Sequence, residues 1–179
     1  MIIQAHEKLK ELNLDDFGTL YIGYNGVPEY GYLSNDIVSS YVEDYLMKNE
    51  GIDTELSNIL GELLIIDNNT SRNEVVDLLD KVVRILNINI LKSSHKWLLV
   101  CLDLKLKNLS ADPLYGLLEL SDFWINWGQL DNSPHMIQGV NNDVDAYDYY
   151  SDDNYVNMIH MNTDWLNVEL NKVKTTSRF

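Results

Sequence analysis

Several features that would narrow the function are scarce in this chain of 179 residues. One cysteine excludes an internal disulfide, and with only three prolines and nine glycines we expect no long flexible linker. No apolar run approaches the roughly 18 residues needed to cross a bilayer. The first residues, MIIQAHEKLKELN, become charged at Glu7 and therefore lack the apolar block of a secretory signal. We expect a cytoplasmic protein without a membrane segment.

Motifs of common catalytic and cofactor sites are also missing. The sequence contains no G-x-S-x-G, H-E-x-x-H, C-x-x-C, G-x-x-x-x-G-K-[ST] or G-x-G-x-x-G, and its four histidines are scattered. The single thiol, Cys101, lies in the apolar run WLLVCLDL, which predicts a buried and unreactive core residue. The loop from Asn141 to Asp152 superficially matches a calcium-binding loop, but Ala146 stands where that loop requires glycine. We therefore predict no catalytic residue, no metal site and no cofactor.

Positive charge is absent from a long stretch of the chain. No lysine or arginine occurs between Leu109 and Asn171, whereas residues 1–108 carry ten basic residues against seventeen acidic ones. The stretch contributes most of the formal net charge of −15 through eleven acids: Asp112, Glu119, Asp122, Asp131, Asp143, Asp145, Asp148, Asp152, Asp153, Asp164 and Glu169. Such a surface repels nucleic-acid phosphates and anionic membranes, so we expect neither as a partner. It attracts a cationic protein, unless the charge serves solubility alone.

The segment NNDVDAYDYYSDDNY, residues 141–155, places this charge beside aromatic rings. Interfaces favour tyrosine and tryptophan, while surrounding carboxylates steer a cationic partner and select against wrong ones. The alternative is a solvated loop whose tyrosines pack on the domain. On the first interpretation, the predicted partner-binding residues are those of this segment and two tryptophans nearby in sequence: Asp143, Asp145, Tyr147, Asp148, Tyr149, Tyr150, Asp152, Asp153, Tyr155, Trp124 and Trp127.

The hydrophobic pattern predicts one mainly helical domain over residues 1–179, of the α+β class, with a small β element near the N-terminus. Hydrophobic residues make up 45% of the chain, enough for a sizeable core. The run FGTLYIGYNG ends at a turn dipeptide and predicts a strand, and YVNMIHM predicts an edge strand. Helices are expected over residues 5–13, 36–49, 54–67, 75–86, 95–108, 113–124 and 163–174, several of them behind capping residues: Ser34, Ser71 with Glu74, Ser94, Asp112 with Pro113, and Asn162.

Two adjacent runs, KWLLVCLDLKLKN and DPLYGLLELSDFW, resemble an uncharacterised bacterial family of mostly helical single domains. The run GYLSNDIVSSYVEDYL is similar to the same family's N-terminal part. With its charge pattern, the chain resembles the small acidic immunity proteins of bacterial polymorphic toxin systems. That resemblance implies a cytoplasmic inhibitor that binds a cognate toxin, often a cationic nuclease, and that needs no catalytic residue.

Two other functions stay open. An enzyme with a carboxylate-based site would show several acids converging in a cleft. An acidic regulatory protein that mimics DNA would need its acids in regular rows on rigid helices. The clustering of aspartates in a turn-rich segment argues against the second.

Overall fold

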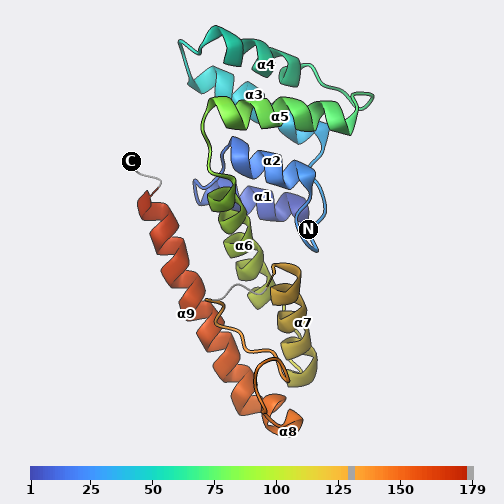
Figure 1. Cartoon of the computed structure of the whole chain (residues 1–179), viewed down its shortest axis with the longest axis vertical. Coiled ribbons are helices and arrows are strands. Elements are labelled where there is room, and N and C mark those ends of the chain that lie inside the picture. Colours follow the sequence, from blue (N-terminus) through green and yellow to red (C-terminus); the bar gives the residue numbers. More distant parts are fainter. Residues whose placement is uncertain (129–131, 177–179) are drawn as a thin grey trace. The chain divides into compact units, whose positions relative to one another are not determined.

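The computed structural model describes residues 1–128 and 132–176, and in these ranges the regular secondary structure is helical (Figure 1). The chain divides into two compact units, Met1–Trp97 and Leu98–Phe179, here called unit 1 and unit 2. The boundary falls inside a helix, so both units share one continuous element. The prediction of a single domain over 1–179 stays a prediction.

Unit 1 is built from the first helices of the chain and the beginning of α6. The bounds are α1 (Ile2–Glu11), α2 (Phe17–Asn25), α3 (Asn35–Lys48), α4 (Thr54–Leu64), α5 (Arg72–Ile85) and α6 (Ile90–Lys107). Helix α5 packs against α2 on one side and against α4 on the other, while α3 also contacts α4 (Figure 1). Trp97 is fully buried in this unit, and its Nε1 donates to the carbonyl oxygen of Thr19 at 2.8 Å.

Unit 2 holds the remainder of α6 together with α7 (Pro113–Asn126), α8 (Ala146–Tyr149) and α9 (Asp152–Thr176). Helix α9 packs against both α7 and α8. Cys101 is fully buried in α6, which confirms the prediction that it is a core residue. Among the described residues, no helix combines the length and the apolarity that crossing a membrane requires.

Local capping explains why several predicted helices begin where they do. The Ser71 hydroxyl accepts from the Glu74 backbone N–H at 3.3 Å and starts α5. The Asp112 carboxylate accepts from the Tyr115 backbone N–H at 3.2 Å, with Pro113 at the first helical position of α7. Both caps satisfy an N–H that has no partner inside its helix. These two predicted starts are confirmed.

The predicted N-terminal β element is wrong, because its first strand is helix α2. A capping box at the start of that helix outweighs the aromatic and β-branched composition of the run. Asp16 Oδ1 accepts from the Thr19 backbone N–H at 2.7 Å, and Thr19 Oγ1 accepts from the Asp16 backbone N–H at 2.8 Å. The Asn25-Gly26 dipeptide ends the helix, with Gly26 at φ 124°, instead of forming a hairpin turn.

The ends of two later helices also differ from the prediction. Helix α6 begins at Ile90, ahead of Ser94, because Asn89 Oδ1 accepts from the Lys92 backbone N–H at 3.1 Å. The predicted edge strand YVNMIHM lies inside α9, and Asn162 lies within that helix and does not cap it. The Asn162 side chain is fully buried and donates to the carbonyl oxygen one turn earlier, so the helix continues through it.

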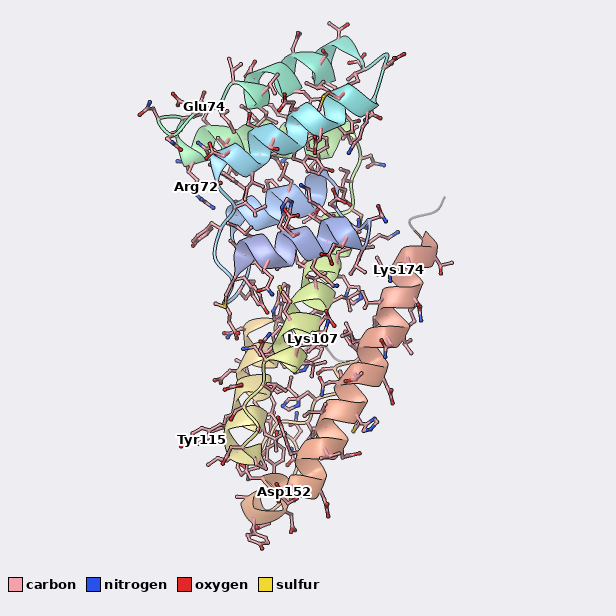
Figure 2. The ribbon with its side chains drawn as sticks, turned by 180° about the vertical axis from the view of Figure 1, so that it is seen from behind. Arg72, Glu74, Lys107, Tyr115, Asp152 and Lys174 are labelled. Carbon is pink, nitrogen blue, oxygen red and sulfur yellow. The ribbon has the colours of Figure 1, made fainter. Side chains whose placement is uncertain are left out.

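Two tyrosine rings lie beside Arg72, which Figure 2 labels at the beginning of α5. The guanidinium carbon lies 4.5 Å from the centre of the Tyr24 ring and 4.3 Å from that of Tyr32. The Tyr24 hydroxyl donates to Asn35 Oδ1 at 2.6 Å, and the Asn35 amide donates to the Asp67 carbonyl oxygen at 2.6 Å. These contacts hold the start of α5 against α2 through cation–π attraction and hydrogen bonds.

Candidate protein-binding surface

The predicted partner-binding segment forms α8 and the first turn of α9, with a short irregular stretch before them. Asp145 Oδ1 caps α8 by accepting from the Tyr147 backbone N–H at 2.7 Å. The Ser151 hydroxyl accepts from the Asn154 backbone N–H at 3.3 Å in the first turn of α9. Polar caps therefore hold this aspartate-rich segment in a defined conformation.

All five aspartates of the segment face solvent. Tyr147 is also outside the core, with 87% of its surface exposed. Figure 2 shows Asp152 at the beginning of α9. We call this set the acidic surface: Asp143, Asp145, Asp148, Asp152, Asp153 and Tyr147.

Tyr149 belongs to the core of unit 2, with 1% of its surface exposed. Its hydroxyl donates to the Met136 carbonyl oxygen at 2.7 Å, and its ring packs with Leu117 and Met158. Burial raises the pKa of this tyrosine. Tyr149 therefore anchors the segment and presents no ring to a partner.

Tyr150 and Tyr155 are half-buried. The Tyr155 hydroxyl donates to the Ser110 carbonyl oxygen at 2.6 Å. Burial raises the pKa of Tyr155, and the nearby Glu119 carboxylate raises it further. The Tyr155 ring lies against Gly116, so this contact holds the beginning of α9 against the N-terminal end of α7.

Replacing Gly116 by alanine is expected to loosen this contact. An added Cβ would lie 2.6 Å from Tyr155 Cε2 and 2.8 Å from the Ser110 carbonyl oxygen, closer than such atoms approach. Overpacking of this kind destabilises by about 1–3 kcal/mol. Urea unfolding measures the effect, with Gly61→Ala as the control, because a Cβ at Gly61 meets no atom within 4 Å. An equal response of the two variants would contradict the packing described.

Neither predicted tryptophan is fully exposed. Trp124 is fully buried, and its Nε1 donates to Asn162 Oδ1 at 2.8 Å. Its ring meets Trp165 edge-on at 5.3 Å between centroids. Trp127 is half-buried, and its ring centroid lies 6.1 Å from that of Phe123. Its Nε1 is buried. The Trp124 ring therefore helps to hold α7 and α9 together, whereas Trp127 packs on α7 itself.

The structure also forms a buried serine–histidine pair that the sequence did not reveal. Ser121 Oγ lies 2.9 Å from His135 Nε2 and donates to the Leu117 carbonyl oxygen at 2.8 Å. Because the Ser121 hydroxyl proton is donated to Leu117, the Ser121 oxygen accepts from Nε2–H of His135. Nδ1 of His135 is then buried without a partner among the described residues. Burial lowers the pKa of His135 to about 4, which keeps the imidazole neutral at neutral pH.

A nucleophilic role does not follow from this pair. Ser121 is 7% exposed and His135 is 8% exposed, so a substrate has no access to either. The pair instead fastens the segment before α8 to α7. The two residues are fourteen positions apart in the sequence, so no local pattern signals their contact.

A polar cavity of about 230 Å³ lies in unit 1, apart from the predicted site residues. It is found where α1 and α3 end, and is lined by Lys10, Asn13, Asp15, Tyr41, Asp44, Tyr45, Lys48 and Asn49. Burial raises the pKa of Tyr41, with the Asp15 carboxylate as the next cause. In the described residues, no group of three or more histidine, cysteine, aspartate or glutamate side chains is arranged to hold a metal ion.

The comparisons with known proteins identify the family of this chain. Residues 7–170 match the model of a family described as an uncharacterized protein conserved in bacteria, DUF2247. No curated protein and no solved structure matches the chain. The family match provides no link to toxin immunity. Because the match covers most of unit 1 and of unit 2, the chain belongs to the bacterial family DUF2247.

Proposed function

We propose that this protein is a non-enzymatic binding module that docks its acidic surface on a cationic protein. One observation carries the proposal: five exposed carboxylates surround a largely exposed tyrosine, within a stretch that has no lysine or arginine. The field of these carboxylates raises the encounter rate with a basic partner and disfavours acidic ones. Tyr147 offers a large, amphipathic ring for a pocket on that partner.

The contacts beneath the acidic surface support the same function. Tyr149 packs on Leu117 and Tyr155 on Gly116, both in α7, and Asp145 caps α8. A surface that is already ordered loses less conformational entropy on binding than a flexible loop does. Docking therefore requires little rearrangement of unit 2.

The finer proposal is that the partner is a bacterial toxin and that binding neutralises it in the cytoplasm. Carboxylates that occupy a groove meant for nucleic-acid phosphates would block a cationic nuclease without chemistry of their own. The resemblance to acidic immunity proteins supports this proposal, whereas the family match gives only the bacterial origin of the chain. Co-expression of the chain with the toxin encoded beside its gene is the direct test, and unchanged killing would contradict it.

An enzyme remains the second candidate, favoured by the cavity in unit 1. That cavity brings together Asp15, Asp44 and two lysines, which are groups able to transfer protons. The regulatory DNA mimic receives less support, since its acids would sit in regular rows. Here they lie on one short helix and the segments flanking it.

Converting the five aspartates of the acidic surface to asparagine is expected to slow association with a cationic partner by about 10- to 100-fold at low salt. Asparagine keeps the cap on α8, so the change removes charge with little effect on folding. Stopped-flow or surface-plasmon measurements with a partner captured from the host, repeated from low to physiological ionic strength, give the rates. For the unchanged protein, the rate should fall steeply as salt rises.

The control removes five exposed acids from unit 1: Asp36→Asn, Glu43→Gln, Glu50→Gln, Glu62→Gln and Asp77→Asn. This control changes the net charge by the same amount as the five-aspartate variant. It therefore distinguishes an effect of the acidic surface from an effect of the total charge. Equal slowing by the two sets of substitutions would reject the acidic surface as the docking site.

A further inference from the structure

Helix α7 exposes a row of large apolar side chains along the edge of its core face. Leu114 and Leu118 are each 41% exposed, Ile125 is 51% exposed and Tyr115 is 60% exposed. Positions four and eleven residues apart point in nearly the same direction at about 3.6 residues per turn, which places Leu114, Leu118 and Ile125 on one side. We call these four residues the α7 apolar face.

The adjoining side of α7 already forms the core of unit 2. Its buried residues are Gly116, Leu117, Leu120, Ser121, Phe123 and Trp124. A surface helix normally carries polar side chains opposite its core face. Helix α7 instead continues its apolar surface past the buried side chains onto its solvent side, and such exposed patches mark interaction sites.

Acidic residues lie beside the α7 apolar face. Asp112 caps the helix, Asp122 lies within it, and both are exposed. No lysine or arginine occurs from Leu109 to Asn171. A complementary partner surface therefore has an apolar centre and a cationic rim, which is the pattern of a basic amphipathic helix.

A second copy of this chain fits the face less well. Residues 98–179 contain twelve acids and five bases, so unit 2 carries a formal charge of −7. Two such units brought face to face would repel each other. The same charge favours a basic partner over self-association.

We propose that the α7 apolar face binds an amphipathic helix of the cationic partner. Leucine-like side chains of that helix pack on Leu114, Leu118 and Ile125, and its lysines or arginines approach Asp112 and Asp122. Figure 2 shows Tyr115 projecting outward from α7 on the side away from α9. The inference rests on the proposed function in that the partner is a cationic protein, and it adds the apolar contacts that hold the complex.

A direct contact joins the two helices that carry these surfaces of unit 2. Tyr155 donates to the Ser110 carbonyl oxygen and packs on Gly116, so the N-terminal end of α7 meets the beginning of α9. That beginning carries Asp152 and Asp153 of the acidic surface. One partner can therefore use the acidic surface for approach and the α7 apolar face for retention, since charge mainly sets on-rates and apolar anchors mainly set off-rates.

A synthetic peptide tests the inference on the full chain without a known partner. The probe is a fluorescein-labelled peptide of about 18 residues, with leucines at helical spacing and lysines elsewhere. Fluorescence anisotropy at physiological salt should show it binding about tenfold more tightly than a scrambled peptide of the same composition. A version with glutamate in place of lysine should not bind, because the rim is acidic.

Variants then locate the binding site. The double substitution L118Q/I125Q should weaken binding of the helical peptide about tenfold, while V156Q/V168Q should change it less than about twofold. The control residues lie on α9 and are 58% and 52% exposed, so the two pairs are matched in character and exposure. All four side chains are outside the core, and circular dichroism verifies that each variant is folded.

Three results would overturn the inference. Equal binding of the scrambled peptide would assign the affinity to charge alone. Unchanged binding by L118Q/I125Q would move the site elsewhere. Sedimentation that shows a dimer of the unchanged chain, dissociated by L118Q/I125Q, would identify a second copy as the occupant. Failure of the five-aspartate variant to slow a native partner would instead reject the proposed function, because that measurement does not depend on the α7 apolar face.

Discussion

Replacing Trp124 by alanine is expected to lower the free energy of unfolding of unit 2 by about 3–5 kcal/mol, the loss typical of a large aromatic residue removed from a packed core. The side chain is fully buried and meets Trp165 edge-on. Its removal would leave a cavity between α7 and α9 and would strip Asn162 Oδ1 of its donor. Urea unfolding followed by circular dichroism measures the change.

Phenylalanine at position 124 separates packing from hydrogen bonding. Trp124→Phe keeps most of the ring volume but leaves the buried Asn162 Oδ1 without a partner, which costs about 1–3 kcal/mol. In the background of Asn162→Leu, the hydrogen-bond part of that loss should disappear, as a double-mutant cycle would show. A Trp124→Ala variant of unchanged stability that nevertheless lost partner binding would restore the sequence-based interpretation of Trp124 as a binding residue.

Acid is expected to destabilise unit 2 by about 3 kcal/mol as the pH falls from about 6.5 to about 4, through His135. Burial lowers the pKa of this imidazole to about 4 in the folded chain, against 6.5 in the unfolded chain. Between these values the unfolded state binds more protons than the folded state does, so stability rises with pH. The contribution is fully present above pH 6.5 and is lost as the pH falls toward 4.

The structural reason for the lowered pKa is that the buried His135 ring has no acceptor for a second proton among the described residues. A proton added at Nδ1 would place a charge beside buried apolar groups without an acceptor among the described residues. An NMR titration of the His135 ring gives the pKa directly, and urea unfolding at several pH values gives the linked stability. In His135→Gln, the pH dependence between 6.5 and 4 should be smaller by the same amount.

His6 provides the matched control for this titration. It is 2% exposed in unit 1, and burial lowers its pKa, with Lys10 as the second cause. His6→Gln should therefore alter the acid sensitivity of unit 1 and leave the His135 titration unchanged. A His135 ring that titrated near 6.5 in the folded protein would contradict the burial described.

The starts of α5 and α7 and the environment of the thiol could be predicted because they depend on nearby residues. Ser71 and Asp112 each cap a helix by accepting from the backbone N–H three positions away. The start of α2 follows the same rule, because the Asp16–Thr19 capping box lies at its beginning although the composition of the run is typical of a strand. The aromatic and β-branched residues of that run lie in a helix and pack into the core of unit 1, because tertiary burial overrides a weak strand preference.

The distribution of charge also followed from the chain alone, and the five aspartates of the acidic surface are indeed exposed. Carboxylates without basic partners remain in water because desolvating them is costly. The α7 apolar face was not predicted, since its residues share a helical pattern with the buried ones. Only packing distinguishes an inward leucine such as Leu117 from an outward one such as Leu118.

The tyrosines show where local rules stop. Four of them alternate with aspartates over a few positions, and nothing in that spacing distinguishes the exposed Tyr147 from the buried Tyr149. Their positions depend on residues far along the chain: Tyr149 meets Leu117, and Tyr155 meets Ser110. Composition and net charge are sums over residues and can be counted from the sequence. Exposure instead depends on which distant side chains the folded chain brings into contact.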